Sequence, residues 1–422
     1  MSDPTTTSAV RVESAVASEL RTDVSSAWLD ARFARRAVAA VFIANGLLFA
    51  SWTAHIPSVQ HSLRFSDGTL GIALLGAPVG SVLAMLVIAP LLPRYGSKLL
   101  VRITLVGYCA AGALVGLAGS LPTIFFALLA WGAFQGALDV AMNTQAIAVE
   151  RAGRRPLMSG LHGTWSIGAF AGAGLGALAV GAHIGLTPQL LVLGAVVLAS
   201  TFVLTRSLLR DQVTEPAVQA GVTVGGQPTG RRWSGAVLLL GSIAFASMLC
   251  EGAAADWASV YLSGPLDSGG AIRGVGYVTF ALAMVVVRLL GNRLLARHHA
   301  NRLLPTLAAV ATAGFGTALA IAEPAAAFAG FFCLGIGLAL VVPTVFSAAG
   351  RLPGLHPGTA VATVSAFGWA GFVTGPPLIG RLAGATSLPT ALALLPVLTF
   401  LITIATVIAG RKLDDRQDAP GK

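Results

Sequence analysis

Long apolar segments alternate with short polar ones along most of this 422-residue chain. A helix needs about 20 apolar residues to cross a bilayer, and segments of that length recur twelve times. The segments are continuously apolar, whereas barrel strands alternate apolar and polar positions. The pattern predicts twelve membrane-spanning helices, at about residues 36–58, 69–92, 99–119, 121–149, 157–181, 187–206, 234–262, 273–292, 303–322, 325–349, 358–382 and 388–410.

Composition supports an all-α polytopic membrane protein. Apolar residues make up 55% of the chain and charged residues 10%, against about a quarter charged in soluble domains. Cys109, Cys250 and Cys333 all fall within apolar segments, and no disulfide framework or metal-ligand spacing is present. We expect neither a cofactor nor a metal.

Basic residues border the apolar segments unevenly. If both termini are cytoplasmic, only Arg64, Arg273 and Arg381 of the 27 Lys and Arg lie on the other face, and Arg288 lies within a span. This asymmetry predicts a multi-pass protein of the inner (plasma) membrane with both termini in the cytoplasm. It also accounts for the net charge of +10 without a nucleic-acid partner, because the basic residues border helices rather than form one patch.

The polar segments divide the chain into parts. Residues 1–35 lack the apolar core of a signal peptide and are interpreted as a disordered cytoplasmic tail. The Gly-containing connection at 207–233 is typical of a flexible linker. It separates an N-terminal six-helix bundle at 36–206 from a C-terminal one at 234–410, and a short cytoplasmic tail follows at 411–422.

The two halves repeat short motifs about 200 residues apart. Phe49-Ala-Ser51 recurs as Phe245-Ala-Ser247, and Trp165 with its following glycines recurs as Trp369 with glycines. Together with six spans in each half, these repeats predict two pseudo-symmetric bundles. In such an arrangement the solute site lies between the halves, near the bilayer midplane.

With two halves of six spans each, residues 36–410 resemble the major facilitator superfamily. The loop Pro93-Arg-Tyr-Gly-Ser-Lys98 resembles the cytoplasmic signature of that family, with Pro93 where the family has an acid. Gly291-Asn-Arg293 is a more degenerate counterpart in the second half. The resemblance implies secondary transport by alternating access.

A narrower resemblance involves the fourth, fifth and seventh spans. Asp139, Asn143, the run Gly160-Leu-His-Gly-Thr-Trp-Ser-Ile-Gly168 and the run Cys250-Glu-Gly-Ala-Ala-Ala-Asp-Trp257 resemble the fucose–proton symporter family and its rhizopine-related branch. This resemblance implies that an acid in the fourth span carries the coupling proton, a role that falls on Asp139 although those relatives have Glu. It also implies a sugar, polyol or amino-sugar as solute.

The residues of the fourth span point to the same acid. A carboxylate inside the membrane costs about 2.5–3.5 kcal/mol, so Asp139 is interpreted as a proton-coupling residue, with pairing to a neighbouring helix as the alternative. Gln135, Asp139 and Asn143 are four residues apart and share one helix face, which is predicted to face the bundle interior. Gln135 and Asn143 offer donors and acceptors to a solute. Interhelical hydrogen bonds are their alternative role.

Three further ionisable residues are candidates. His162, near the cytoplasmic mouth, could relay a proton or simply be hydrogen-bonded. Glu251 is assigned to the cavity and to proton coupling, while Asp256, five residues on, points elsewhere and is placed at the outer interface. Arg288 lies at a depth that allows a pair with Glu251. The alternative is that Arg288 clamps an anionic substrate or acts as a gate.

Aromatic, Gly and Pro residues complete the candidates. Trp52, Trp131 and Trp369 are predicted to stack on a solute ring, with packing as the alternative, and Trp165 is a further substrate-binding candidate. Glycines at every fourth position over 168–176 predict close helix packing. Pro376-Pro377 predicts a break in the helical ladder of the eleventh span.

The function predicted is transport of a small polar solute, coupled to protons, by a monomer in the bilayer. A proton-antiport efflux carrier for amphipathic compounds is the first alternative, and a Met- and Phe-dominated cavity would favour it. A membrane receptor or scaffold is the second, although the polar loops are short for a signalling domain. Catalytic and Walker motifs are absent from the sequence, so no enzyme or ATP-driven transport is expected.

Overall fold

The computed structural model describes residues 32–153, 157–209, 235–352, 355 and 357–417. Within these ranges every regular element is a helix. Most of the predicted N-terminal tail and most of the predicted linker lie outside the described residues.

The helices follow the predicted order. The chain opens with a span over Arg32–Ser62, which ends in η1 (Thr53–His55) and α2 (Ile56–Ser62). The first half continues with α3 (Asp67–Leu74), α4 (Gly76–Tyr95), α5 (Ser97–Val115), α6 (Leu121–Gly153), α7 (Met158–Gly181), α8 (Leu186–Leu204) and η2 (Thr205–Ser207). The second half consists of α9 (Gly235–Ser263), α10 (Ile272–Arg297), α11 (Ala300–Ile321), α12 (Pro324–Leu338), α13 (Val341–Ala349), α14 (Pro357–Ala385), α15 (Leu388–Leu392) and α16 (Leu394–Gln417).

Eleven segments in the described ranges are long and apolar enough to cross a membrane. The 29-residue helix α14 lies at the eleventh predicted position and completes the twelve-helix pattern. The prediction of an all-α polytopic fold is therefore confirmed.

Prolines explain why four spans are each made of more than one helical element. Pro57, Pro78, Pro343 and Pro396 each follow a break between two elements by a few residues. A proline has no N–H to donate and its ring crowds the carbonyl four residues earlier, so the helix is interrupted there. Pro376-Pro377 behaves differently from the prediction, because α14 continues through both prolines.

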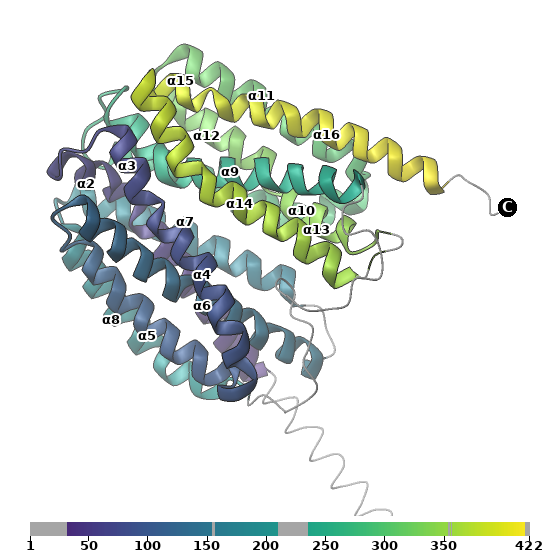
Figure 1. Cartoon of the computed structure of the whole chain (residues 1–422), viewed down its shortest axis with the longest axis horizontal. Coiled ribbons are helices and arrows are strands. Elements are labelled where there is room, and N and C mark those ends of the chain that lie inside the picture. The colour runs from purple at the N-terminus through teal and green to yellow at the C-terminus, as the bar shows by residue number, and fades with distance from the viewer. Residues whose placement is uncertain (1–31, 154–156, 210–234, 353–354, 356, 418–422) are drawn as a thin grey trace, which may run out of the picture.

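The helices form two bundles (Figure 1), one from the first half of the chain and one from the second. The bundles contact each other mainly through α3 against α14 and α7 against α10. We call the end of the molecule that holds Tyr95, Ser207 and Gly235 the linker end. The end that holds α2 and α15 is called the opposite end.

Glycine brings helices together within each bundle. Gly172 of α7 lies so close to the backbone of Leu47 that a Cβ would collide with it, and Gly168 and Gly176 make equivalent contacts with the same helix. The close-packing role predicted for these glycines is confirmed. Gly371 of α14 lies in the same way against α9, so the corresponding pair of the second bundle repeats the contact.

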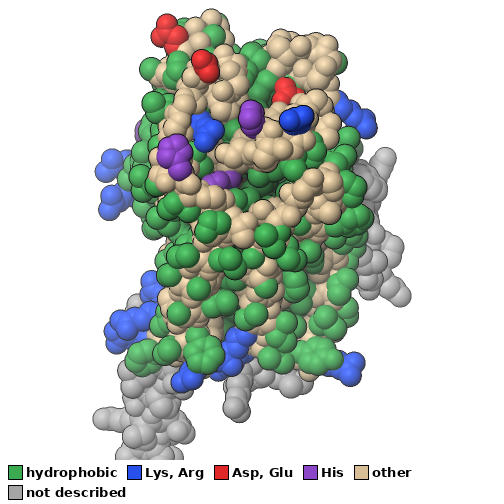
Figure 2. All heavy atoms as spheres, turned by 90° about the vertical axis from the view of Figure 1, so that its left-hand side faces the viewer, with side chains coloured by type: hydrophobic (Ala, Val, Ile, Leu, Met, Phe, Trp, Pro, Cys, Tyr) green, Lys and Arg blue, Asp and Glu red, His purple; other side chains and the backbone are tan. Residues whose placement is uncertain are grey.

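The polarity of the surface changes along the length of the spans. Figure 2 shows a broad region of hydrophobic side chains, with Lys and Arg along its lower edge and acidic, His and basic side chains together at the upper end. An apolar belt bounded by polar ends is the surface expected of a protein that crosses a bilayer.

Candidate functional site

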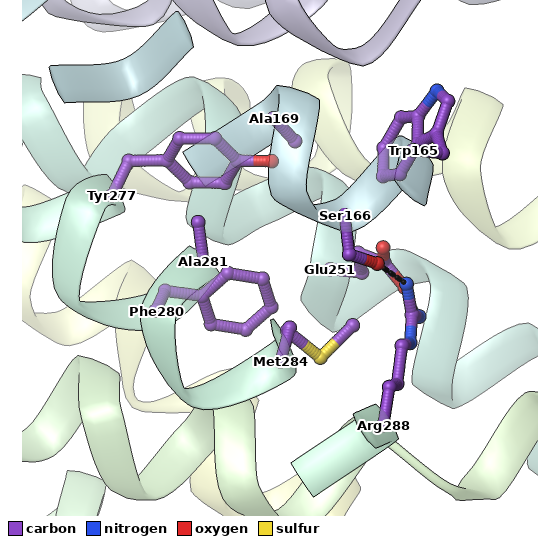
Figure 3. A pocket seen from close by; sticks show the side chains of 9 residues that line it. All are labelled: Trp165, Ser166, Ala169, Glu251, Tyr277, Phe280, Ala281, Met284 and Arg288. Carbon is purple, nitrogen blue, oxygen red and sulfur yellow. Dashed lines mark hydrogen bonds and ion pairs between the residues drawn. The ribbon is translucent and has the colours of Figure 1, made fainter. Parts of the chain in front are cut away.

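Arg288 of α10 occupies the boundary between the bundles. Its Nη1 donates a hydrogen bond to the Ser166 hydroxyl of α7 at 3.0 Å, and its Nε donates to the Ala339 carbonyl at 3.3 Å. Its Nη2 lies 3.7 Å from a carboxylate oxygen of Glu251 on α9. Figure 3 shows the guanidinium held between Ser166 and Glu251. The pair predicted from the depths of Glu251 and Arg288 is confirmed.

Both charges retain hydrogen-bonding capacity. The 3.7 Å separation is longer than a hydrogen bond, and the side chains of Arg288 and Glu251 are 20% and 21% exposed. Among the described residues, none donates a hydrogen bond to the Glu251 carboxylate. A solute that reaches this point therefore meets free acceptor positions on Glu251 and a free Nη2 on Arg288.

A small cavity opens beside the pair. Three helices line it, through Trp165, Ser166 and Ala169 of α7, Glu251 of α9, and Tyr277, Phe280, Ala281, Met284 and Arg288 of α10. The Tyr277 hydroxyl points toward this space, opposite Ala169 (Figure 3). The volume open to the centre of a water-sized sphere is about 10 Å³, room for about one water molecule. The cavity must widen before it can admit a larger solute.

Trp165 is held in place by the first span. Its indole N–H donates to the side-chain oxygen of Asn45 at 3.0 Å, and its ring lies 6.0 Å from that of Phe49. Asn45 is fully buried, and its side-chain nitrogen is among the buried polar atoms that lack a hydrogen-bond partner within the described structure. Trp165 thus presents its ring to the cavity from a fixed position.

The predicted polar face of α6, formed by Gln135, Asp139 and Asn143, does not face the cavity as one unit. Gln135 accepts a hydrogen bond from Ser81 of α4 at 3.0 Å, which is the interhelical alternative for this residue. Asn143 donates to the backbone carbonyl of Asp139 at 2.8 Å. Neither Gln135 nor Asn143 lines the cavity beside Arg288.

Asp139 is half-buried in the middle of α6. In the described part of the chain no Lys, Arg or His nitrogen lies within 4.0 Å of its carboxylate, since the one ion pair found there joins Arg288 to Glu251. The Asn143 amide is its neighbour on the next turn. Asp139 is therefore an intramembrane carboxylate that no neighbouring cation neutralises.

The structure places the other candidates apart from the cavity. His162, one helical turn before Ser166, is exposed, and its ring centroid lies 5.4 Å from that of Phe42 in a T-shaped arrangement. Trp52 is buried in the first bundle, where its ring contacts that of Trp131. Trp369 lies against Phe372 of its own helix. Of the four candidate tryptophans Trp52, Trp131, Trp165 and Trp369, only Trp165 lines the cavity.

Sequence reasoning did not single out Ser166, Tyr277 or Asn45. Asn45 and Ser166 are polar residues inside apolar spans, and such residues hydrogen-bond across helices. That criterion would have found both. Tyr277 shows no such pattern, because a tyrosine near a span end is equally typical of a membrane interface.

A twelve-helix membrane fold with a polar site between two bundles defines the class of secondary transporters. The model of the Major Facilitator Superfamily matches residues 37–357, so the chain belongs to that family. The family marks it as a transporter of small molecules rather than an enzyme.

Relatives cover nearly the whole chain. An uncharacterised MFS-type transporter of Yersinia pestis is 33% identical over 375 residues, which are 87% of this chain and 92% of the relative. Membrane protein MosC of Rhizobium meliloti is 31% identical over 377 residues, 89% of this chain and 90% of MosC. The match to MosC agrees with the rhizopine-related part of the sequence resemblance. The narrower resemblance to fucose–proton symporters stays a prediction.

Solved structures share the fold. A bacterial homologue of the human lysosomal transporter Spinster, inward-facing and unoccupied, superposes with a TM-score of 0.68 at 13% identity, over 93% of this chain and 99% of that one. A mutant of the nucleoside transporter NupG gives 0.69 at 12% identity, over 89% and 99%. At these identities the likeness concerns the fold alone.

Proposed function

We propose that the protein carries a small polar solute, such as a sugar, polyol or amino-sugar, across the inner (plasma) membrane by proton-coupled alternating access. The observation that carries the proposal is the cavity between the bundles. Arg288 supplies a donor, Glu251 an acceptor and Tyr277 a hydroxyl, and Trp165 adds an aromatic face. Convergent polar groups beside an aromatic ring suit a hydroxylated solute rather than a purely apolar one.

The size of the cavity supports alternating access. Space for about one water molecule cannot hold a sugar, so the bundles must separate at one end to load the site. At the opposite end they approach closely, since a Cβ on Gly71 of α3 would strike Pro376 of α14, and one on Gly274 of α10 would strike Ala177 of α7. These contacts fit a state in which that end is shut.

Charge distribution supports both termini in the cytoplasm. Arg94, Arg102 and Arg206 lie at the linker end, and Lys98 donates there to the carbonyls of Arg206 and Leu208 at 2.6 and 2.7 Å. The excess of basic residues at this end is typical of a cytoplasmic face. The protein is proposed to act as a monomer without nucleic acid.

Two acids support proton coupling. Asp139 is an intramembrane carboxylate without a cationic neighbour among the described residues, and Glu251 lies 3.7 Å from Arg288, a distance that leaves its oxygens available. A carboxylate that changes between a dry and a wet environment during the cycle can take up and release a proton. We assign the coupling proton to Asp139 and a supporting role to Glu251, with His162 as a relay toward the linker end.

The test is uptake into proteoliposomes. Labelled myo-inositol, D-glucosamine and L-fucose are offered with and without an imposed pH gradient, while a trapped pH dye reports proton movement. Asp139→Asn should abolish gradient-driven accumulation and preserve exchange, because Asn keeps hydrogen bonding but does not titrate. The matched control is Asp267→Asn, an exposed acid in a left-handed turn that asparagine also accepts. Full accumulation by Asp139→Asn would reject Asp139 as the coupling residue.

One observation favours efflux as a second candidate. Phe280 and Met284 form an apolar wall of the cavity, which an amphipathic compound could contact. If this candidate is correct, vesicles acidified inside should take up an amphipathic dye such as ethidium in exchange for protons, and the three polar solutes should not move.

A further inference from the structure

His55 lies where the two bundles meet at the opposite end. It ends η1, which packs against α7 of its own bundle and against α9 and α10 of the other. A Cβ on Gly274 of α10 would stand 3.0 Å from the side chain of Ala54, the residue before His55. His55 is only 3% exposed, so its ring is enclosed by this boundary.

The hydrogen bonds of His55 fix where its protons can sit. Gln189 of α8 donates from its side-chain nitrogen to the Ser51 carbonyl at 2.9 Å, which turns its oxygen toward His55. That oxygen lies 2.7 Å from His55 Nε2. Nε2 must therefore be the protonated nitrogen of the neutral ring, and Nδ1 is the position left for a second proton.

Arg273 of α10 is a charged residue at the same contact. It immediately precedes Gly274, whose Cβ position lies 3.0 Å from the side chain of Ala54, and its Nε is buried without a hydrogen-bond partner among the described residues. The elements around η1 also carry His61 on α2, His162 on α7, Glu251, Asp256 and Tyr261 on α9, and Tyr277 on α10. Of the charged residues on these elements, Arg273 is the one next to Gly274, where α10 approaches Ala54.

We propose that His55 is a second proton-binding residue, and that a proton taken from solvent onto its Nδ1 drives the bundles apart at the opposite end. The charged ring would add a second positive charge to the contact between η1 and α10, where Arg273 is half-buried and His55 is buried. Like charges repel more strongly where burial lowers the effective dielectric constant. Separation hydrates both groups, so protons shift the population toward the state that is open at this end.

The experiment measures the distance between bundles by double electron–electron resonance in nanodiscs at about pH 8 and about pH 5.5, a range in which an ordinary histidine titrates. Spin labels are placed on Ser62→Cys and Thr386→Cys, both exposed at the opposite end. The native Cys109, Cys250 and Cys333 are replaced by alanine. A second pair, Ala152→Cys and Ala296→Cys, reports on the linker end.

Acidification should raise the population with a long distance at the opposite end by about threefold. His55→Gln, which keeps an amide facing Gln189 but takes no proton, should give no change with pH. Arg273→Gln should remove most of the response, because the repelling charge is gone. The matched control His61→Gln, an exposed residue of α2, should respond like the parent chain.

Three results would overturn the proposal: a parent chain insensitive to pH, a full response in His55→Gln, or loss of the response in His61→Gln. If the cysteine replacements impair folding, hydrogen exchange of the η1–α2 segment in the unmodified chain, corrected for intrinsic rates, gives the same comparison. No solute enters either measurement. Failure here therefore leaves the proposed transport standing, and failure of uptake leaves this inference standing.

Discussion

Arg288 in the second bundle and Ser166 in the first are joined by a hydrogen bond of 3.0 Å. The Ser166 hydroxyl in turn donates to the His162 carbonyl at 3.2 Å, so the contact connects the guanidinium to the backbone of α7. Because each partner belongs to a different bundle, this bond must break whenever the bundles separate at that level.

Loss of the Ser166 hydroxyl should therefore destabilise the contact between bundles. A hydrogen bond to a charged group contributes about 1.5–3 kcal/mol, and partial exposure of Arg288 reduces this to about 1 kcal/mol for Ser166→Ala. Thermal unfolding in detergent micelles measures the change. The control Ser200→Ala removes a hydroxyl that bonds only to a carbonyl of its own helix and should have little effect. Equal melting of the two variants would contradict the prediction.

Glu251 and Arg288 should show coupled effects. Glu251→Gln leaves Arg288 without its ion-pair partner, and Arg288→Gln does the same to Glu251, so each single change should lower stability. The double change should recover part of the loss, with an interaction energy of about 1 kcal/mol. A double-mutant cycle on unfolding free energies measures it. Strictly additive losses would mean that the two residues act independently.

The contact between α7 and the first span should tolerate no side chain. Gly172→Ala places a Cβ against the backbone of Leu47 and should cost about 1–3 kcal/mol of stability, because backbone cannot move aside by a rotamer change. Gly174→Ala on the same helix is the control, since nothing lies within 4 Å of its Cβ position. The comparison uses melting temperatures in detergent, and a variant pair with equal values would refute the tight contact.

Most of the fold could be predicted from the chain alone. The length of the apolar runs specifies how many helices cross the membrane, because every backbone polar group in lipid must be satisfied within a helix. The repeated glycines over 168–176 predicted a close contact between helices, since only glycine permits such close approach, but they did not identify the first span as the partner. The breaks at Pro57, Pro78, Pro343 and Pro396 were not foreseen, although proline chemistry explains each of them.

The site was predictable only in part. The depths of Glu251 and Arg288 along their helices were close enough to allow a side-chain pair, and the cost of burying an unpaired charge favoured that pair. Depth does not specify rotation of a helix, however, so Trp52 and Trp165 looked equivalent although one packs in the first bundle and the other lines the cavity. Helix rotation also explains the outcome for Gln135, which accepts a hydrogen bond from Ser81. The sequence could not show whether the polar face of α6 points to a neighbouring helix or to the solute.

The glycine contacts between α7 and the first span have a mechanical consequence. Where side chains separate two helices, rotamer changes can absorb a displacement of one helix before it reaches the other. Here bare backbone touches backbone over several turns, so the two helices behave as a single stiff lever. A tilt of α7 at Ser166 should therefore move the first span, which leads into His55, together with α7, so a change at the site between the bundles is transmitted to the opposite end by rigid backbone.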